Sequence, residues 1–370
     1  MAGTRAQSDE ARRERDPESA QAVEEFLLSM KGQPALYHCV SRVVDRRKVL
    51  GAEERTKFVE FMREYEAFCQ VRVLTHCVMG NHFHILVEVP EAPEDRGRSW
   101  SDEEFLRHIS SRYHGEQYAR IANKLAWWRE RGIDSEAEKL RDRHFARMWD
   151  LSWFLRLLKQ RFTQWFNWKH GRDGYLWSDR FRSLLVESGR AARMVAAYID
   201  LNPVRAGLVK DPADWAWSGW GEALAGDRRA REGLRMVVFD WLGATRNEQL
   251  AARDVNTWEK TASWYRATMF MDAEEDERDR KKNRAGISAD KVAEVLEEEG
   301  LREEAEMVRQ RVPAFTEARV IGRSGFVDAV GAFRLGRVPV PLVTWKEEQE
   351  AKARQLAALH GSRKAALAEK

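Results

Sequence analysis

Two short runs of β-forming residues, separated by one tight turn, constrain the fold of this chain more than any other feature. Residues 71–79 and 83–89 are rich in valine, leucine and other apolar side chains, and Gly80-Asn81 stands between them. A connection this short joins two strands as an antiparallel hairpin. We therefore expect a β-hairpin over 71–89, which needs further strands or helices to bury its apolar side chains.

The segments on either side of the hairpin alternate between strand and helix patterns. They are a strand at 35–44, a helix at 52–68, a helix at 151–168, a strand at 176–187 and a helix at 191–201. The helices are indicated by apolar residues at steps of three and four, and the last one ends before Pro203. The resulting β-α-β-β-α-β-α order predicts an α+β fold, a ferredoxin-like or RRM-like split βαβ sandwich whose antiparallel sheet carries helices on one face.

The rest of the sequence is assigned to additions around this sandwich. A chain of 370 residues is longer than one such domain needs, and 43% hydrophobic residues are enough for a core. The expected divisions are a polar N-terminal arm at 1–33, the sandwich domain at 34–225 with a helical insertion at about 91–150, a helical accessory region at 226–345 with a charged linker at about 272–284, and a charged tail at 346–370.

Composition excludes several classes of protein. No apolar run approaches the roughly 18 residues that a membrane span requires, and the first 25 residues are charged, which does not fit a secretory signal. Three cysteines, Cys39, Cys69 and Cys77, do not form a disulfide framework and fit a reducing compartment. We therefore expect a cytoplasmic protein that does not bind membranes.

The distribution of positive charge says more than its total. The net charge of +3 is too small to indicate a polyanionic partner. Between Trp153 and Arg182, however, seven lysines and arginines face two acids, and aromatic residues are interleaved among them. Part of this segment is expected to be core, and the rest could contact phosphates and stack against bases.

A pair of histidines at the start of the second hairpin strand is the sharpest local feature. Alternate side chains of a strand leave the same face, so His82 and His84 should project together. Two adjacent imidazoles make half of a divalent metal site. One alternative is a surface histidine beside a hydrogen-bonded structural one. Another is a zinc site that includes His76 and Cys77, although the chain has no Cys-x-x-Cys pair.

A tyrosine and an asparagine mark the last helix of the expected sandwich. Tyr198 and Asn202 are four residues apart and share a helix face. A tyrosine in this position can also be a half-buried packing residue.

Three ordered motifs resemble one known family. They are MGNHFHILV at 79–87, GYLWSDRFRS at 174–183 and YIDLNPVRAGLV at 198–209. Together they resemble the HUH single-tyrosine transposases, in particular the REP-associated tyrosine transposases of bacteria. The first expected strand, YHCVSR at 37–42, is also similar, and the resemblance covers about residues 34–225.

The resemblance implies a role for each matching residue. His82 and His84 match the histidines that hold a divalent ion, Mg²⁺ or Mn²⁺, and Tyr198 matches the nucleophile. Asn202 matches a third, polar metal ligand that many relatives supply as glutamine. Tyr175 is the competing nucleophile. The candidates for DNA-phosphate contacts are Arg42, Arg46, Arg47, Arg180, Arg182 and Arg205.

The expected function is that of a metal-dependent single-stranded DNA endonuclease and strand transferase. It would act through a 5′-phosphotyrosine, in transposition or in processing repeated palindromes. Its expected partner is single-stranded DNA with an imperfect hairpin, bound by a monomer or homodimer near the bacterial nucleoid, with residues 226–370 helping to grip DNA. One alternative is a catalytically inactive DNA- or RNA-hairpin binding protein. Another is a metal hydrolase that uses His76, Cys77, His82 and His84.

Overall fold

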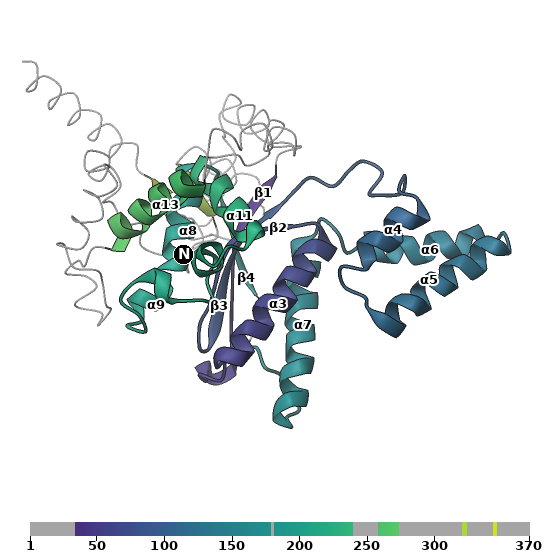
Figure 1. The fold of residues 1–370 in the computed structure, drawn as a ribbon, viewed down its shortest axis with the longest axis horizontal. Coiled ribbons are helices and arrows are strands. Elements are labelled where there is room, and N and C mark those ends of the chain that lie inside the picture. The colour runs from purple at the N-terminus through teal and green to yellow at the C-terminus, as the bar shows by residue number, and fades with distance from the viewer. Residues whose placement is uncertain (1–33, 179–180, 240–257, 274–319, 324–342, 346–370) are drawn as a thin grey trace, which may run out of the picture. The chain divides into compact units, whose positions relative to one another are not determined.

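The computed structural model describes residues 34–178, 181–239, 258–273, 320–323 and 343–345 (Figure 1). The chain divides into two compact units, 34–316 and a second one made of 1–33 with 317–370. The expectations for the N-terminal arm, for the charged tail and for most of the charged linker lie outside the described residues. No described helix is long and apolar enough to cross a membrane.

An antiparallel sheet forms the centre of the unit 34–316. Its strands are β1 (Ala35–Arg42), β2 (Arg72–Val78), β3 (His82–Val89) and β4 (Arg182–Val186), in the order β2-β3-β1-β4. The predicted hairpin is β2 and β3, and its turn is closed by a 2.8 Å bond from the Met79 amide to the His82 carbonyl. The predicted α+β sandwich with an antiparallel sheet is confirmed.

Two long helices cover one face of this sheet. They are α3 (Ala52–Cys69) and α7 (Leu151–His170). Phe58 of α3 lies between Phe83 of β3 and Phe162 of α7, with ring centroids 4.7 and 5.2 Å apart. These residues are fully buried, so the helical periodicity seen in the sequence is explained by burial against the alternate residues of β3.

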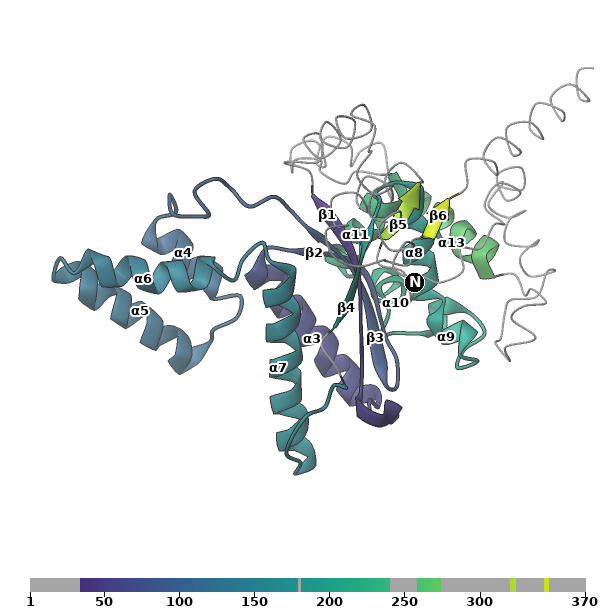
Figure 2. The same cartoon turned by 180° about the vertical axis from the view of Figure 1, so that it is seen from behind.

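The other face is covered as well, which corrects the expectation of helices on one face only. The helices on this face are α8 (Arg190–Asp200), α10 (Gly219–Leu224), α11 (Arg228–Phe239) and α13 (Trp258–Ala273) (Figure 2). The physical reason is that β2 and β3 carry buried side chains on both faces, such as Leu86 beside Ile85. A Cβ on Gly233 of α11 would lie 2.5 Å from the Leu74 carbonyl oxygen, so only glycine allows this close approach.

Segment 217–218 protects the free edge of β2. The Val78 amide donates to the Trp217 carbonyl at 2.9 Å, and Cys77 and Ser218 form an isolated bridge. Such cover prevents an edge strand from pairing with another chain. Helices α11 and α13 therefore belong to the same compact unit as the sandwich, because α11 packs on β2 and α13 packs on α8.

A helical insertion separates β3 from α7, as the sequence predicts. It contains α4 (Asp102–Ile109), α5 (Gly115–Glu130) and α6 (Asp134–Phe145) (Figure 2). The end of α3 anchors it, since the Phe68 ring stacks on His108 at 5.8 Å and the Trp149 amide donates to the Cys69 carbonyl at 2.7 Å. Short elements complete the unit: η1 (Val44–Arg46), α9 (Asn202–Arg205) and η2 (Pro212–Asp214).

Strands replace helix in part of the predicted helical accessory region 226–345. β5 (Val320–Arg323) and β6 (Val343–Trp345) pair in parallel in the second unit. Their β-branched residues, Val320, Ile321, Val343 and Thr344, favour a strand over a helix.

Candidate active site

Three histidines share the sheet face that α8 covers. Arg42 pairs with His82 and Val40 pairs with His84, so the alternation of β1 places His38 on the same face. The His82 and His84 ring centroids are 5.1 Å apart, and the His38 ring stacks on His84 at 5.2 Å. The side-by-side arrangement expected of His82 and His84 is present, with His38 as a third ring.

Helix α8 brings Tyr198 to these histidines. The Tyr198 ring meets His84 edge to face at 5.8 Å and His38 at 6.1 Å, and the Arg205 guanidinium lies 5.0 Å from the tyrosine ring centroid. Tyr175, by contrast, is 91% exposed, and its ring contacts none of the three histidines in the described structure. Tyr198, and not Tyr175, is thus the tyrosine that packs beside the three histidines.

A buried carboxyl group fixes the end of α8. Asp200 accepts hydrogen bonds from the Thr75 hydroxyl at 2.7 Å, from the Trp220 amide at 3.2 Å and from the Tyr265 hydroxyl. These donors belong to β2, α10 and α13. The helix that carries Tyr198 is thus attached to three neighbouring elements through one side chain two residues away.

Electrostatics keeps the histidine pair in the neutral form that binds metals. Burial, with a smaller contribution from the Arg42 charge, lowers the pKa of His82 to about 4. Burial first, then His82, His38 and Arg42, lowers the pKa of His84 well below its ordinary value. A neutral imidazole has one nitrogen lone pair for a metal ion.

Hydrogen bonds orient both rings. His82 Nδ1 lies 2.7 Å from the Asn81 side-chain oxygen, which only accepts, so Nδ1 carries the proton and Nε2 the lone pair. His84 Nδ1 and His38 Nε2 lie 2.9 Å apart, and one of the two rings donates to the other. Partners of this kind orient metal-binding histidines.

These residues fit a partial metal site. Among the described residues, no group of three His, Cys, Asp or Glu side chains is placed to hold a metal ion. A divalent ion on His82 and His84 would need an amide oxygen, water or substrate phosphate to complete its coordination. In the alternative set, His76 pairs with Ile85 and so lies on the opposite face of the sheet from His84, whereas Cys77 pairs with His84 and shares its face.

Asn202 lies just after the end of α8, where its side chain hydrogen-bonds to carbonyl groups of the last helical turn. Its Nδ2 donates to the carbonyls of Tyr198 at 2.9 Å and Ile199 at 3.2 Å, two groups at the helix terminus. The side-chain oxygen is the atom that could bind a metal ion. Its role as a third ligand stays a prediction.

Most of the arginines predicted to contact phosphates lie near the histidine end of the sheet. Arg42 ends β1 opposite His82, and the Arg46 carbonyl accepts a 2.8 Å bond from Asn81, next to His82. Arg47 follows in the same turn, Arg182 begins β4, and Arg205 lies over Tyr198. Arg180 lies outside the described residues.

Two parts of this arrangement were missed by reasoning from the sequence. In the sequence His38 stands out only as part of the strand motif at 37–42, although the two-residue periodicity places it on the face of Val40 and Arg42. Its contact with His84 depends on strand register. Tyr265 has no local signal at all, because its partner Asp200 is 65 residues away.

Comparisons with known proteins agree with the motifs. Residues 33–130 match the family model described as IS200-like transposase; that segment includes His82 and His84 and ends before Tyr198. A solved structure of a REP-associated tyrosine transposase bound to a REP hairpin aligns with 52% of this chain and 81% of that one, at 16% identity and a TM-score of 0.34. No curated protein matches the chain. Residues 33–130 of this chain are thus similar to the IS200-like transposases.

Proposed function

We propose that this protein is a metal-dependent single-stranded DNA endonuclease and strand transferase with Tyr198 as its nucleophile. The observation that carries the proposal is the edge-to-face contact of Tyr198 with His84, one of two neighbouring imidazoles that burial keeps neutral. The IS200-like transposase match supports DNA as the substrate.

The chemistry required of these residues follows from the phosphodiester group. Its negative charge repels nucleophiles, and a divalent ion such as Mg²⁺ or Mn²⁺, when bound by His82 and His84, would supply positive charge to its non-bridging oxygens. A phenol with an ordinary pKa near 10 is a weak nucleophile at neutral pH. The Arg205 guanidinium over the Tyr198 ring favours the developing phenolate.

The proposed reaction conserves the energy of the broken bond. As the Tyr198 oxygen bonds to phosphorus, the phenol loses its proton and the bond to the 3′ oxygen breaks, so that the leaving strand takes up a proton and ends in a 3′-hydroxyl. The 5′ end stays on the enzyme as a phosphotyrosine. A 3′-hydroxyl from another strand can reverse the step and join DNA without ATP. This supports transposition or the processing of palindromic repeats.

The test is detection of the covalent adduct. We would incubate the full-length protein with end-labelled single-stranded hairpin DNA and Mn²⁺ and separate the products on a denaturing gel. The parent protein should give a protein–DNA band, Tyr198→Phe should give none, and the matched control Tyr175→Phe should behave as the parent does. An adduct that persists in Tyr198→Phe contradicts the proposal. Hairpin binding without cleavage by the parent, with any divalent ion, would favour the inactive hairpin-binding alternative.

A further inference from the structure

Two aromatic side chains at the end of α7 face solvent almost completely. Trp168 is 81% exposed and Tyr175 is 91% exposed. The other aromatic residues of the basic segment 153–182 are buried or partly buried, so the core accounts for them. A large aromatic ring left in water forgoes the stabilisation that burial would give. These two rings therefore call for an explanation outside the core.

The loop between the two rings is firmly held. The helix ends at Gly171 in a left-handed conformation, the Arg172 amide donates to the Asn167 carbonyl at 2.9 Å, and the Asn167 side chain donates to the Gly174 carbonyl at 2.9 Å. Leu176, directly after Tyr175, is buried in the core. Exposure of Trp168 and Tyr175 is thus a property of an ordered surface, which we call the aromatic platform.

The platform is joined to the end of the sheet that carries the candidate site. The Val44 amide donates to the Leu176 carbonyl at 2.9 Å, Val43 forms an isolated bridge with Trp177, and the Ser178 amide donates to the Arg42 carbonyl at 3.0 Å. Arg42 is the strand partner of His82. A single strand of DNA bound at the histidines could therefore continue onto the aromatic platform.

The charge around the platform fits a polyanion. In the described parts of segments 42–48 and 168–182, the exposed arginine and lysine side chains outnumber the exposed acidic ones. The basic residues are Arg42, Arg46, Arg47, Lys48 and Arg182, and the acidic residues are Asp45 and Asp173. The phosphates of a nucleic acid bind such basic side chains. Its unpaired nucleobases stack on exposed aromatic rings with little regard to sequence. Bases inside a duplex stem are already stacked and paired, so the rings fit only unpaired nucleotides.

We propose that Trp168 and Tyr175 form a stacking site for unpaired nucleotides next to the DNA hairpin. This inference depends on the proposed function for the hairpin itself, but its test does not require cleavage. In this arrangement the arginines contact the backbone and the two rings hold the bases of the single-stranded tail.

The experiment measures binding to three probes on a Tyr198→Phe background, which keeps the DNA intact. The probes are a hairpin with an unpaired tail of about eight nucleotides, the same hairpin with abasic sugars in the tail, and a hairpin without a tail. Trp168→Ala and Tyr175→Ala should each weaken binding of the first probe roughly tenfold and leave binding of the other two unchanged. The matched control is Trp127→Ala, since Trp127 of α5 is 47% exposed on the insertion, and it should change none of the three.

Three results would overturn the stacking site. They are unchanged affinity for the tailed hairpin in both variants, an equal loss with the abasic tail, and a loss of self-association in sedimentation experiments without a loss of DNA affinity. The last result would assign the platform to contact between copies of the chain. The two proposals can fail separately. If the parent protein forms no covalent adduct, but Trp168→Ala and Tyr175→Ala lose affinity only for the tail that carries nucleobases, the proposed cleavage is wrong and the stacking site is supported.

Discussion

Asp200 is the buried acid that attaches α8, the helix that carries Tyr198, to its neighbouring elements. Burial raises the pKa of its carboxyl group to about 7, although the hydrogen bonds from Tyr265, Thr75 and the Trp220 amide act in the opposite direction. Its ordinary value is 3.8. Between pH 3.8 and about pH 7 the folded protein keeps a proton on Asp200 that the unfolded chain has already lost. The contribution of Asp200 to the free energy of unfolding therefore falls as the pH rises through this range.

We therefore predict a pH-dependent difference between the parent and Asp200→Asn. The parent's free energy of unfolding, minus that of the variant, should fall by up to about 4 kcal/mol from pH 4 to pH 7 and then stay level. Urea unfolding across that range measures it. Tyr265→Phe keeps the carboxyl group and should keep the fall, whereas a difference between parent and Asp200→Asn that is constant with pH would contradict the prediction.

At the residue scale, local features of the site could be predicted and long-range partners could not. The shared face of His82 and His84 follows from strand alternation within three residues. The contact between His38 and His84 joins positions 46 residues apart, and it depends on the register of β1 against β3. Alternation alone does not specify register, which is why His38 was not assigned a role.

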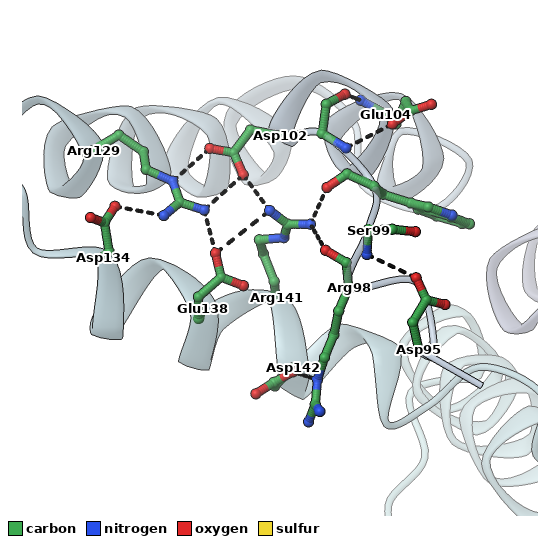
Figure 3. A network of polar contacts seen from close by, with 12 residues as sticks. Asp95, Arg98, Ser99, Asp102, Glu104, Arg129, Asp134, Glu138, Arg141 and Asp142 are labelled. Atoms are coloured by element: carbon green, nitrogen blue, oxygen red, sulfur yellow. Dashed lines mark hydrogen bonds and ion pairs between the residues drawn. The ribbon is translucent and has the colours of Figure 1, made fainter. Parts of the chain in front are cut away.

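At the scale of elements, the insertion is held together by ion pairs between its helices. Arg141 of α6 donates to Asp102 of α4 at 2.8 Å and to the carbonyls of Arg98 and Trp100, while Arg129 of α5 also binds Asp102 (Figure 3). The side chain of Arg141 is 5% exposed and that of Arg129 is 29% exposed. The alternating charges of this segment, which could be read as a solvated surface, thus pair across three helices.

Because Arg141 is more deeply buried than Arg129, we expect the two substitutions to lower the free energy of unfolding by different amounts. Arg141→Ala should lower the free energy of unfolding by roughly 2 to 4 kcal/mol, because it removes a buried guanidinium and takes donors from Asp102 and from the carbonyls of Arg98 and Trp100. Arg129→Ala should lower it by less than about 1 kcal/mol, because water replaces its bonds. Urea denaturation of both variants checks the order, and an equal or smaller loss for Arg141→Ala would contradict it.

The order of elements could be predicted, but the covering of the sheet could not. Periodicity located α3 and α7 to within a few residues, since each buries one continuous apolar face. The second face is covered by helices as far along the chain as α13, and their assignment to this sheet depends on packing such as that of Gly233 against Leu74. A single glycine in a sequence does not indicate which strand it will approach.

At the scale of the whole molecule, the region after residue 225 completes the sandwich. Helix α11 packs on β2, and α13 contributes the Tyr265 hydroxyl to Asp200 and packs on α8. A chain that ends at 225 would keep α8 and α10 on this sheet face but lose α11 and α13, and Asp200 would lose one of its donors. From the sequence, residues 226–370 are expected to help grip DNA, whereas in the structure α11 and α13 also support the helix that carries Tyr198.

This leads to a prediction that compares two truncations. Residues 1–225 alone should show no cooperative urea transition and should form no covalent adduct with hairpin DNA, because burial of the second face contributes at about 25 cal/mol per Å² of apolar surface. Residues 1–316 keep the whole unit 34–316 and should retain a cooperative transition. Circular dichroism in urea and the adduct gel measure both. If residues 1–225 unfold cooperatively and form the adduct at the rate of the longer chain, α11 and α13 do not support the nucleophile helix, and their function is separate from the chemistry.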